Sequence, residues 1–193
     1  MISRIIHKAA ETKHDLSIAL RKARYDSKVF CIGYNKTGTT SLGKSLEILG
    51  YRNSSFNKKV WRKYYKEGHL DKVLAYTAKF DSVDDLPWLL EDMIPLLDET
   101  FPQSKFIYLE RDEESWKKSY YNWHHKLTDQ YPDIDKALQK FQAHKDFVFE
   151  YFKDRPSQDF IVLNIREKGG FKKLADFLGK PTDQLDFPHY NKT

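Results

Sequence analysis

The chain has 193 residues, of which 40% are hydrophobic and 15% aromatic. This composition favours one packed globular domain and excludes a disordered chain. The formal net charge of +5 suits an anionic ligand, without choosing among nucleic acid, lipid and a phosphorylated small molecule. The single cysteine, Cys31, excludes a disulfide framework and a cysteine-based metal site.

The N-terminal segment, residues 1–27, is basic and has no run approaching the roughly 18 apolar residues of a membrane span. It also lacks the continuous apolar stretch and cleavage site of a secretory signal, so we expect a cytoplasmic protein. Ile2, Ile5 and Ile6 recur at helical spacing, which predicts a helical extension. This helix would either pack on the domain or touch a membrane surface as a basic amphipathic segment.

Strands and helices are predicted to alternate along the rest of the chain. The order is a strand at 28–33, a helix at 40–51, one or two helices within 57–76, a strand at 76–82, a helix at 87–101, a strand at 104–110, helices at 112–127 and about 133–154, a strand at 159–165 and a helix at 170–179. This alternation predicts a single α/β domain, a three-layer sandwich whose mostly parallel sheet of about 4–5 strands carries helices on both faces. Its core would span residues 28–190, with residues 1–27 as the extension.

A glycine-bearing loop joins the first predicted strand to the first predicted helix. Gly33 and Gly38 have the G-x-x-x-x-G spacing of a nucleotide-binding loop, and backbone N–H groups at a helix start attract an anion. A nucleotide-hydrolysing loop would next require lysine and then serine or threonine; Thr39 and Thr40 stand there, so the lysine is missing from that place. The lysine, Lys36, lies inside the loop instead. The loop is therefore predicted to hold an anion without the usual arrangement of lysine and metal.

The stretch "YNKTGTTSL", residues 34–42, resembles the 5′-phosphosulfate loop of sulfotransferases that use 3′-phosphoadenosine-5′-phosphosulfate (PAPS), in particular the small bacterial-type members with a P-loop fold. The usual core of that loop is Pro-Lys-[Ser/Thr]-Gly-Thr-[Thr/Ser], and Asn35 replaces the proline here. The resemblance implies that the loop binds the 5′ end of the donor. The residues so implied are Lys36, Thr37, Gly38, Thr39, Thr40 and Ser41.

A second motif supports the same resemblance. Arg111 follows the predicted strand 104–110, and Ser119 comes eight residues later, the spacing at which the family binds the 3′-phosphate of the nucleotide. Arginine offers a two-pronged donor to phosphate, and a serine about two helical turns on can share its face. The C-terminal segments "GGFKKLADFLGKP" and "FPHYN" also resemble the small bacterial-type members.

The resemblance implies transfer of a sulfuryl group from PAPS to a hydroxyl or amine, leaving 3′-phosphoadenosine 5′-phosphate (PAP), without a metal. Lys36 would stabilise charge on the leaving phosphate oxygen. A general base is expected near the end of the strand before 104–110, where Asp81 is our first candidate and Asp85 the second. Asp85 could instead cap the following helix. His124 and His125 are the next candidates.

Other interpretations of the sequence remain open. One is a P-loop kinase or phosphotransferase that uses ATP and Mg²⁺, and another is a non-catalytic protein that binds anions or a membrane surface. The basic, aromatic segment 56–69 could stack on single-stranded nucleic acid, but no nucleic-acid motif accompanies it. We expect that segment to form an acceptor-side or lid helix. The acceptor itself, whether a small molecule, lipid or carbohydrate, is not specified by any pattern, and neither is the oligomeric state.

Overall fold

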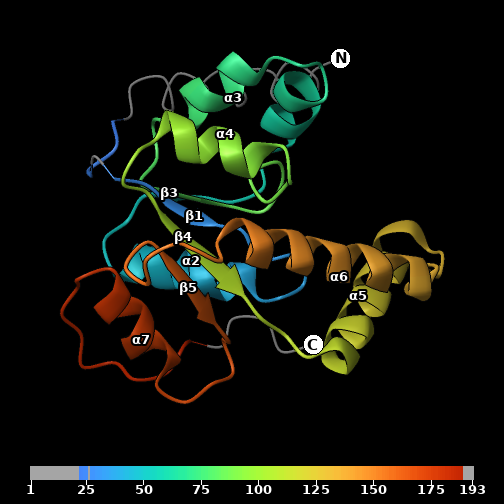
Figure 1. Ribbon diagram of the computed structural model, residues 1–193. Helices are drawn as coiled ribbons and strands as arrows, with labels where there is room; N and C mark the ends of the chain where they lie inside the picture. Colours follow the sequence, from blue (N-terminus) through green and yellow to red (C-terminus); the bar gives the residue numbers. More distant parts are fainter. Residues whose placement is uncertain (1–21, 26, 189–193) are drawn as a thin grey trace, which may run out of the picture.

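The computed structural model describes residues 22–25 and 27–188. The predicted helical extension over residues 1–27 therefore lies for the most part outside the described residues, and so do residues 189–193 at the C-terminal end. The described part is built on one parallel sheet with helices on both faces (Figure 1). This is the predicted α/β architecture.

The sheet has five strands in the order β2-β3-β1-β4-β5, and every adjacent pair is parallel. The strands are β1 (Val29–Cys31), β2 (Asn53–Ser54), β3 (Ser82–Asp84), β4 (Lys105–Leu109) and β5 (Phe160–Leu163). Strands β2 and β3 lie on one side of β1, and β4 and β5 lie on the other side, so the direction in which strands are added to the sheet changes at β1. In open parallel sheets such a switch point, at the carboxyl ends of the strands, is where ligands bind.

The helices are α2 (Thr39–Ile48), the π-helix η1 (Val60–Tyr65), α3 (Leu70–Thr77), α4 (Met93–Thr100), α5 (Glu113–Thr128), α6 (Ile134–Tyr151) and α7 (Gly170–Phe177). Helices α3 and α4 cover one face of the sheet, and α2 and α7 cover the other (Figure 1). Helices α5 and α6 form a hairpin beside the sheet, and the C-terminal part of α6 packs with α3 and α4 through Val148.

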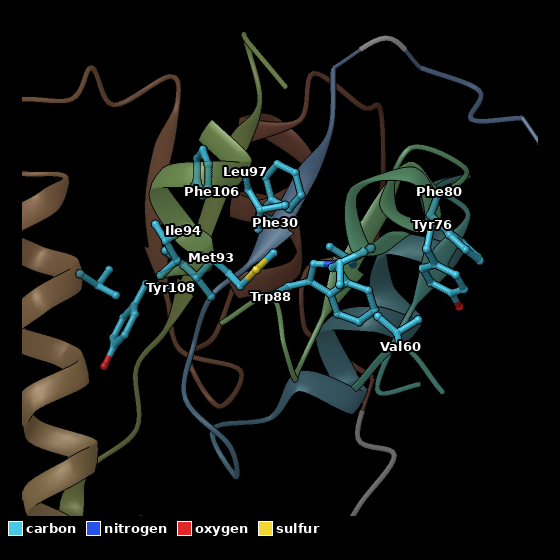
Figure 2. Packing of buried hydrophobic residues seen from close by; sticks show 14 of the residues in the cluster. Phe30, Val60, Tyr76, Phe80, Trp88, Met93, Ile94, Leu97, Phe106 and Tyr108 are labelled. Atoms are coloured by element: carbon cyan, nitrogen blue, oxygen red, sulfur yellow. The ribbon is translucent and has the colours of Figure 1, made fainter. Parts of the chain in front are cut away.

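Alternating strand residues divide the core into two layers. On β1, Phe30 faces the α3–α4 side, whereas Val29 and Cys31 face α2 and α7. Figure 2 shows Phe30 packed with side chains of α4, including Met93 and Leu97, in the larger cluster. This period-two burial is what a parallel sheet with helices on both faces requires.

The prediction of a strand at residues 76–82 is wrong. Tyr76 and Thr77 end helix α3, and the strand begins only at Ser82. The aromatic and β-branched residues that suggested a strand are buried in the helical core instead: Thr77 accepts a 2.8 Å hydrogen bond from Trp88 Nε1. The edge strand β2 was not predicted, since two residues carry no detectable alternation. The remaining predicted strands and helices are confirmed, although α4 begins at Met93 rather than near Pro87.

Candidate functional site

The loop after β1 adopts a backbone that favours glycine at one position. Gly38, which precedes α2, has φ 116°, and a Cβ there would lie 2.3 Å from Cδ1 of Ile165. Lys36 also has a positive φ, 69°. No side chain caps the start of α2. The Ser41 amide donates to the Gly38 carbonyl at 3.0 Å, whereas the Thr39 and Thr40 amides, which begin the helix, are left as donors for a ligand.

Three hydrogen bonds hold the carbonyl groups at the start of this loop. The Tyr34 carbonyl accepts from Thr37 Oγ1 at 2.7 Å, and the Asn35 carbonyl accepts from Trp116 Nε1 at 2.8 Å. The Lys36 carbonyl accepts from Arg111 Nη1 at 2.6 Å. These contacts fix the loop to α5 and to the end of β4. They also satisfy three acceptors that would otherwise repel a bound anion.

The loop opens into a cavity of about 620 Å³. Its lining comes from the loop and start of α2 (Asn35, Lys36, Gly38, Thr39, Thr40, Ser41), from Asp85, from Arg111 and α5 (Ser119, Asn122, Trp123, Lys126), and from the segment after β5 (Asn164, Ile165, Arg166). Four cationic side chains therefore share the cavity with one carboxylate. The cavity lies beyond the carboxyl ends of β1, β3, β4 and β5, as the switch-point rule predicts.

Two cations of the cavity, Lys36 and Arg111, have pKa values below their usual range. Burial and the neighbouring Arg111 lower the pKa of Lys36, against a smaller opposing effect of Asp85. Burial and Arg166 lower the pKa of Arg111. An anion placed among these groups would relieve both effects, so the cavity is electrostatically suited to a phosphate or sulfate group.

The two predicted phosphate motifs meet in this cavity. Arg111 follows β4 and Ser119 lies on α5, with only 4% of Ser119 exposed. The Arg111 guanidinium is oriented by Ser115, whose Oγ accepts from Nε at 2.8 Å. The side chain of Thr37 does not line the cavity, because its hydroxyl is used within the loop. The binding roles of these residues stay predictions.

Asp85 faces the loop across the cavity. Its Oδ1 accepts from Asn35 Nδ2 at 2.8 Å and from the Leu86 amide at 2.7 Å. Burial raises the pKa of the Asp85 carboxyl, while these two hydrogen bonds and Lys36 oppose the rise. A carboxylate of this kind, beside a cation and an anion cradle, has the chemistry of a general base.

Asp81, our first candidate for the base, is placed incorrectly by the sequence argument. It precedes β3, at the opposite end of the strand from the cavity, and its side chain is 0% exposed. Its carboxylate accepts hydrogen bonds from the backbone amides of Arg24, Tyr25 (3.1 Å) and Arg52 (2.8 Å). Asp81 thus ties the chain together at the amino end of the sheet and does not line the cavity. The physical reason for the error is the late start of β3.

Other candidates also lie away from the cavity. His124 and His125 are on α5, but neither belongs to the described residues that line the cavity; His125 packs against Tyr131 at a ring distance of 4.4 Å. The segment 56–69 packs against α3 and does not line it either. The lid role expected of that segment is therefore not supported by its position.

Six cavity residues were missed by sequence reasoning. Asn122, Trp123 and Lys126 follow Ser119 at helical spacings of three, four and seven, so one face of α5 lines the cavity. Asn164, Ile165 and Arg166 directly follow β5 at its carboxyl end. Both sets could have been found by extending the Ser119 face along α5 and by applying the switch-point rule to β5.

The described residues contain no group of histidine, cysteine and carboxylate side chains that could hold a metal ion. Over the same ranges, 22–25 and 27–188, no helix combines the length and the apolar character needed to cross a bilayer.

The fold and the cavity together define a P-loop-like α/β protein with a cationic cavity beside the loop. Comparison with protein families gives the same result more specifically. A family model described as "Sulfotransferase domain" matches residues 28–136 and 123–193, so the chain belongs to the sulfotransferase domain family. No curated protein matches the chain in sequence.

Two solved structures are similar to this chain. The sulfotransferase STF9 from Mycobacterium avium is similar with a TM-score of 0.54 and 12% sequence identity, covering 90% of this chain and 68% of its own. A gluconokinase from Sinorhizobium meliloti 1021 has a TM-score of 0.49 and 14% identity, covering 81% of this chain and 97% of its own. At 12% identity, the likeness to the sulfotransferase STF9 concerns the fold alone.

Proposed function

We propose that the protein is a PAPS-dependent sulfotransferase that transfers the sulfuryl group to a hydroxyl or amine of a small molecule, lipid or carbohydrate. The observation that carries the proposal is the meeting of three groups in one cavity. These are the loop with Lys36, the pair Arg111 and Ser119, and the carboxylate of Asp85. Membership of the sulfotransferase domain family supports the reaction type.

The donor would be held at two places. The first-turn N–H groups of α2, with the side chains of Thr39, Thr40 and Ser41, would bind its 5′-phosphosulfate end. Arg111 and Ser119 would bind its 3′-phosphate, with Arg166 as a further cation on the same wall of the cavity. The cationic excess of the cavity fits a polyanionic donor and leaves one carboxylate for the acceptor.

When bound, the donor supplies a sulfur atom whose bond to the bridging phosphate oxygen can break. Asp85 would accept the proton of the acceptor hydroxyl as the acceptor oxygen bonds to that sulfur. Lys36 would stabilise the electron pair that remains on the phosphate oxygen of the departing PAP. The products are a sulfate ester, PAP and protonated Asp85, so atoms and charge balance. Transfer of this type depends mainly on positioning and on charge stabilisation.

Ligand selectivity tests the donor assignment. PAP at 100 times its dissociation constant should raise the free energy of unfolding by about 2.7 kcal/mol, seen as a shift of the melting temperature. ATP with Mg²⁺ should give a smaller shift at equal concentration, because Thr39 stands where nucleotide-hydrolysing loops carry the lysine that reaches the β- and γ-phosphates. PAPS should then be consumed with hydroxyl acceptors. A larger shift with ATP and Mg²⁺, and phosphoryl transfer, would refute the proposal.

A further inference from the structure

The side chain of Asn35 connects the phosphate loop to the carboxylate on the neighbouring strand end. Asn35 Nδ2 donates to Asp85 Oδ1 at 2.8 Å, while the Asn35 carbonyl is held by Trp116. The amide orientation follows from chemistry, because an asparagine oxygen turned toward the ionised Asp85 would place two acceptors against each other. The contact therefore constrains Asp85 only while residue 35 carries a donor.

Both hydrogen bonds that the described residues make to the Asp85 side chain end on the same oxygen. Asn35 Nδ2 and the Leu86 amide share Oδ1. Neither donor uses Oδ2, so the lone pairs of Oδ2 remain for a proton from outside. Because two donors fix Oδ1, the rotation of the carboxylate about its terminal torsion is restricted, and Oδ2 is held in one direction.

Residue 35 is also the position where this loop departs from the resembling pattern. That pattern has proline, which has no side-chain donor and could not make this contact. We propose that Asn35 is a positioning residue: its amide orients the Asp85 carboxylate so that Oδ2 can accept the proton of the acceptor. A hydrogen bond donated to a carboxylate also favours its ionised form. This inference rests on the proposed function for its catalytic part, but the contact itself can be tested without it.

The charged groups around Asp85 set the expected direction of its titration. Lys36 faces it from the loop and favours the ionised form, whereas buried Asp84, the preceding residue, interacts unfavourably with it. From α5, Lys126 lines the same cavity, and from the end of β4, Arg111 does so. Substitution of Asn35 leaves all these charges in place. Its effect on Asp85 is therefore separable from a general change in the charge of the cavity.

A direct test follows the side-chain carboxyl signal of Asp85 by carbon-13 NMR as the pH changes. The signal is assigned by its loss in Asp85→Asn, and no nucleotide is added. The titration midpoint should rise in Asn35→Ala, which removes the donor, and rise further in Asn35→Asp, which keeps the size but adds a carboxylate. Asn122→Ala removes another amide from the same cavity and should leave the midpoint unchanged. Coincident midpoints in the three forms at residue 35 would overturn the inference.

A second measurement tests the consequence for turnover, with PAPS as donor and 2-naphthol as the acceptor probe. Asn35→Ala should lose roughly tenfold in turnover below the midpoint of the unmodified chain, with a smaller loss as the pH rises and Asp85 ionises in both forms. The affinity for PAP should stay within a few-fold. A loss of turnover that is equal at all pH values would mean that Asn35 only shapes the loop, and would overturn the positioning role.

The two proposals fail in distinguishable ways. If the unmodified chain binds no PAP and consumes no PAPS with any hydroxyl or amine acceptor, the proposed function is wrong, while the order of NMR midpoints still decides whether Asn35 controls Asp85. If PAPS is consumed but the acid side of the pH profile does not move with the NMR midpoint, Asp85 is not the base. That result overturns the inference and leaves the sulfotransferase activity standing.

Discussion

Arg111 Nη1 donates a hydrogen bond of 2.6 Å to the carbonyl oxygen of Lys36, which lies 75 residues earlier in the chain. This bond joins the two segments that the sequence marks as phosphate-binding. It leaves Arg111 with further guanidinium donors, since arginine has five. A bisphosphate ligand that engages both segments would therefore bind to groups that are already held together, which limits the entropy lost on binding.

Arg111→Ala should remove the preference for a 3′-phosphate. The unmodified chain should bind PAP about 10- to 100-fold more tightly than adenosine 5′-phosphate, as expected for a charge-assisted arginine contact. In Arg111→Ala the two ligands should bind within a few-fold of each other, as measured by calorimetry. Arg62→Ala, an exposed arginine on η1 outside the cavity, should keep the full preference. Equal binding of both ligands by the unmodified chain would contradict the second phosphate site.

Lys36→Ala should lower turnover more than it lowers PAP affinity. The charge of Lys36 is needed most when the bond to the phosphate oxygen breaks, so removing it should reduce turnover by about 10²- to 10³-fold. The affinity for PAP should fall only a few-fold. Lys44→Ala on α2, where Lys44 pairs with Glu47 at 2.7 Å, is the matched lysine control. Weak PAP binding with retained turnover would show that Lys36 is only a ground-state anchor.

Gly38→Ala should destabilise the protein as well as abolish PAP binding. Two effects combine: a φ of 116° is unfavourable for alanine, and the added Cβ would meet Ile165 Cδ1 at 2.3 Å. We expect a loss of more than about 2 kcal/mol in urea unfolding. Gly179 has φ 64°, and a Cβ added there would meet no atom within 4 Å. Gly179→Ala should therefore show only the smaller backbone effect. Equal losses in the two variants would contradict the contact with Ile165.

The phosphate loop and most of the fold could be predicted because their signals are local. Strand β4 is a continuous apolar run, and the start of α2 follows a glycine-rich loop, so both appear in a short window of sequence. Arg111 and Ser119 could be paired because their spacing resembles the second phosphate motif of the family, although Arg111 itself precedes α5. Each of these predictions depended on residues close in the chain.

Our first candidate for the base was misplaced, because the position of a residue near β3 depends on where a three-residue strand begins. Tyr76, Thr77 and Phe80 have strand-like propensities, but they are buried in the core beside α3. The ring of Tyr76 contacts Phe80 and Trp88, and Thr77 accepts a hydrogen bond from Trp88. Tertiary packing thus overrides propensity here. The strand end moves from residue 82 to Asp84, so Asp85, and not Asp81, lies beside the cavity at the carboxyl end of β3. Arg166 was missed because the switch-point rule was not applied to the end of β5.

Asp84 should make stability depend on pH. Burial raises the pKa of this carboxyl to about 7, against hydrogen bonds from Asn53 and Ser55. Because the folded pKa exceeds the unfolded value, the favourable contribution is full at low pH and is lost as the pH rises toward about 7. Asp84→Asn should flatten this slope, which is at most about 1.4 kcal/mol per pH unit. Urea unfolding from pH 4 to 8 measures it, and identical slopes in both proteins would contradict the assignment.

Asp81→Asn and Asp85→Asn should have opposite effects, which separates a structural carboxylate from a catalytic one. In Asp81→Asn an amide replaces an oxygen that accepts backbone N–H groups, so the protein should lose about 1–3 kcal/mol of stability and keep its turnover per folded molecule. In Asp85→Asn the proton acceptor is lost, so turnover should fall by roughly 10²- to 10⁴-fold. PAP affinity should stay within a few-fold, because the lost carboxylate faces the acceptor side. Urea unfolding and PAPS turnover, measured on both variants, decide the matter. Full turnover in Asp85→Asn would show that Asp85 is not the general base. An Asp81→Asn protein that is stable but inactive would show that Asp81 contributes to catalysis from the other end of β3.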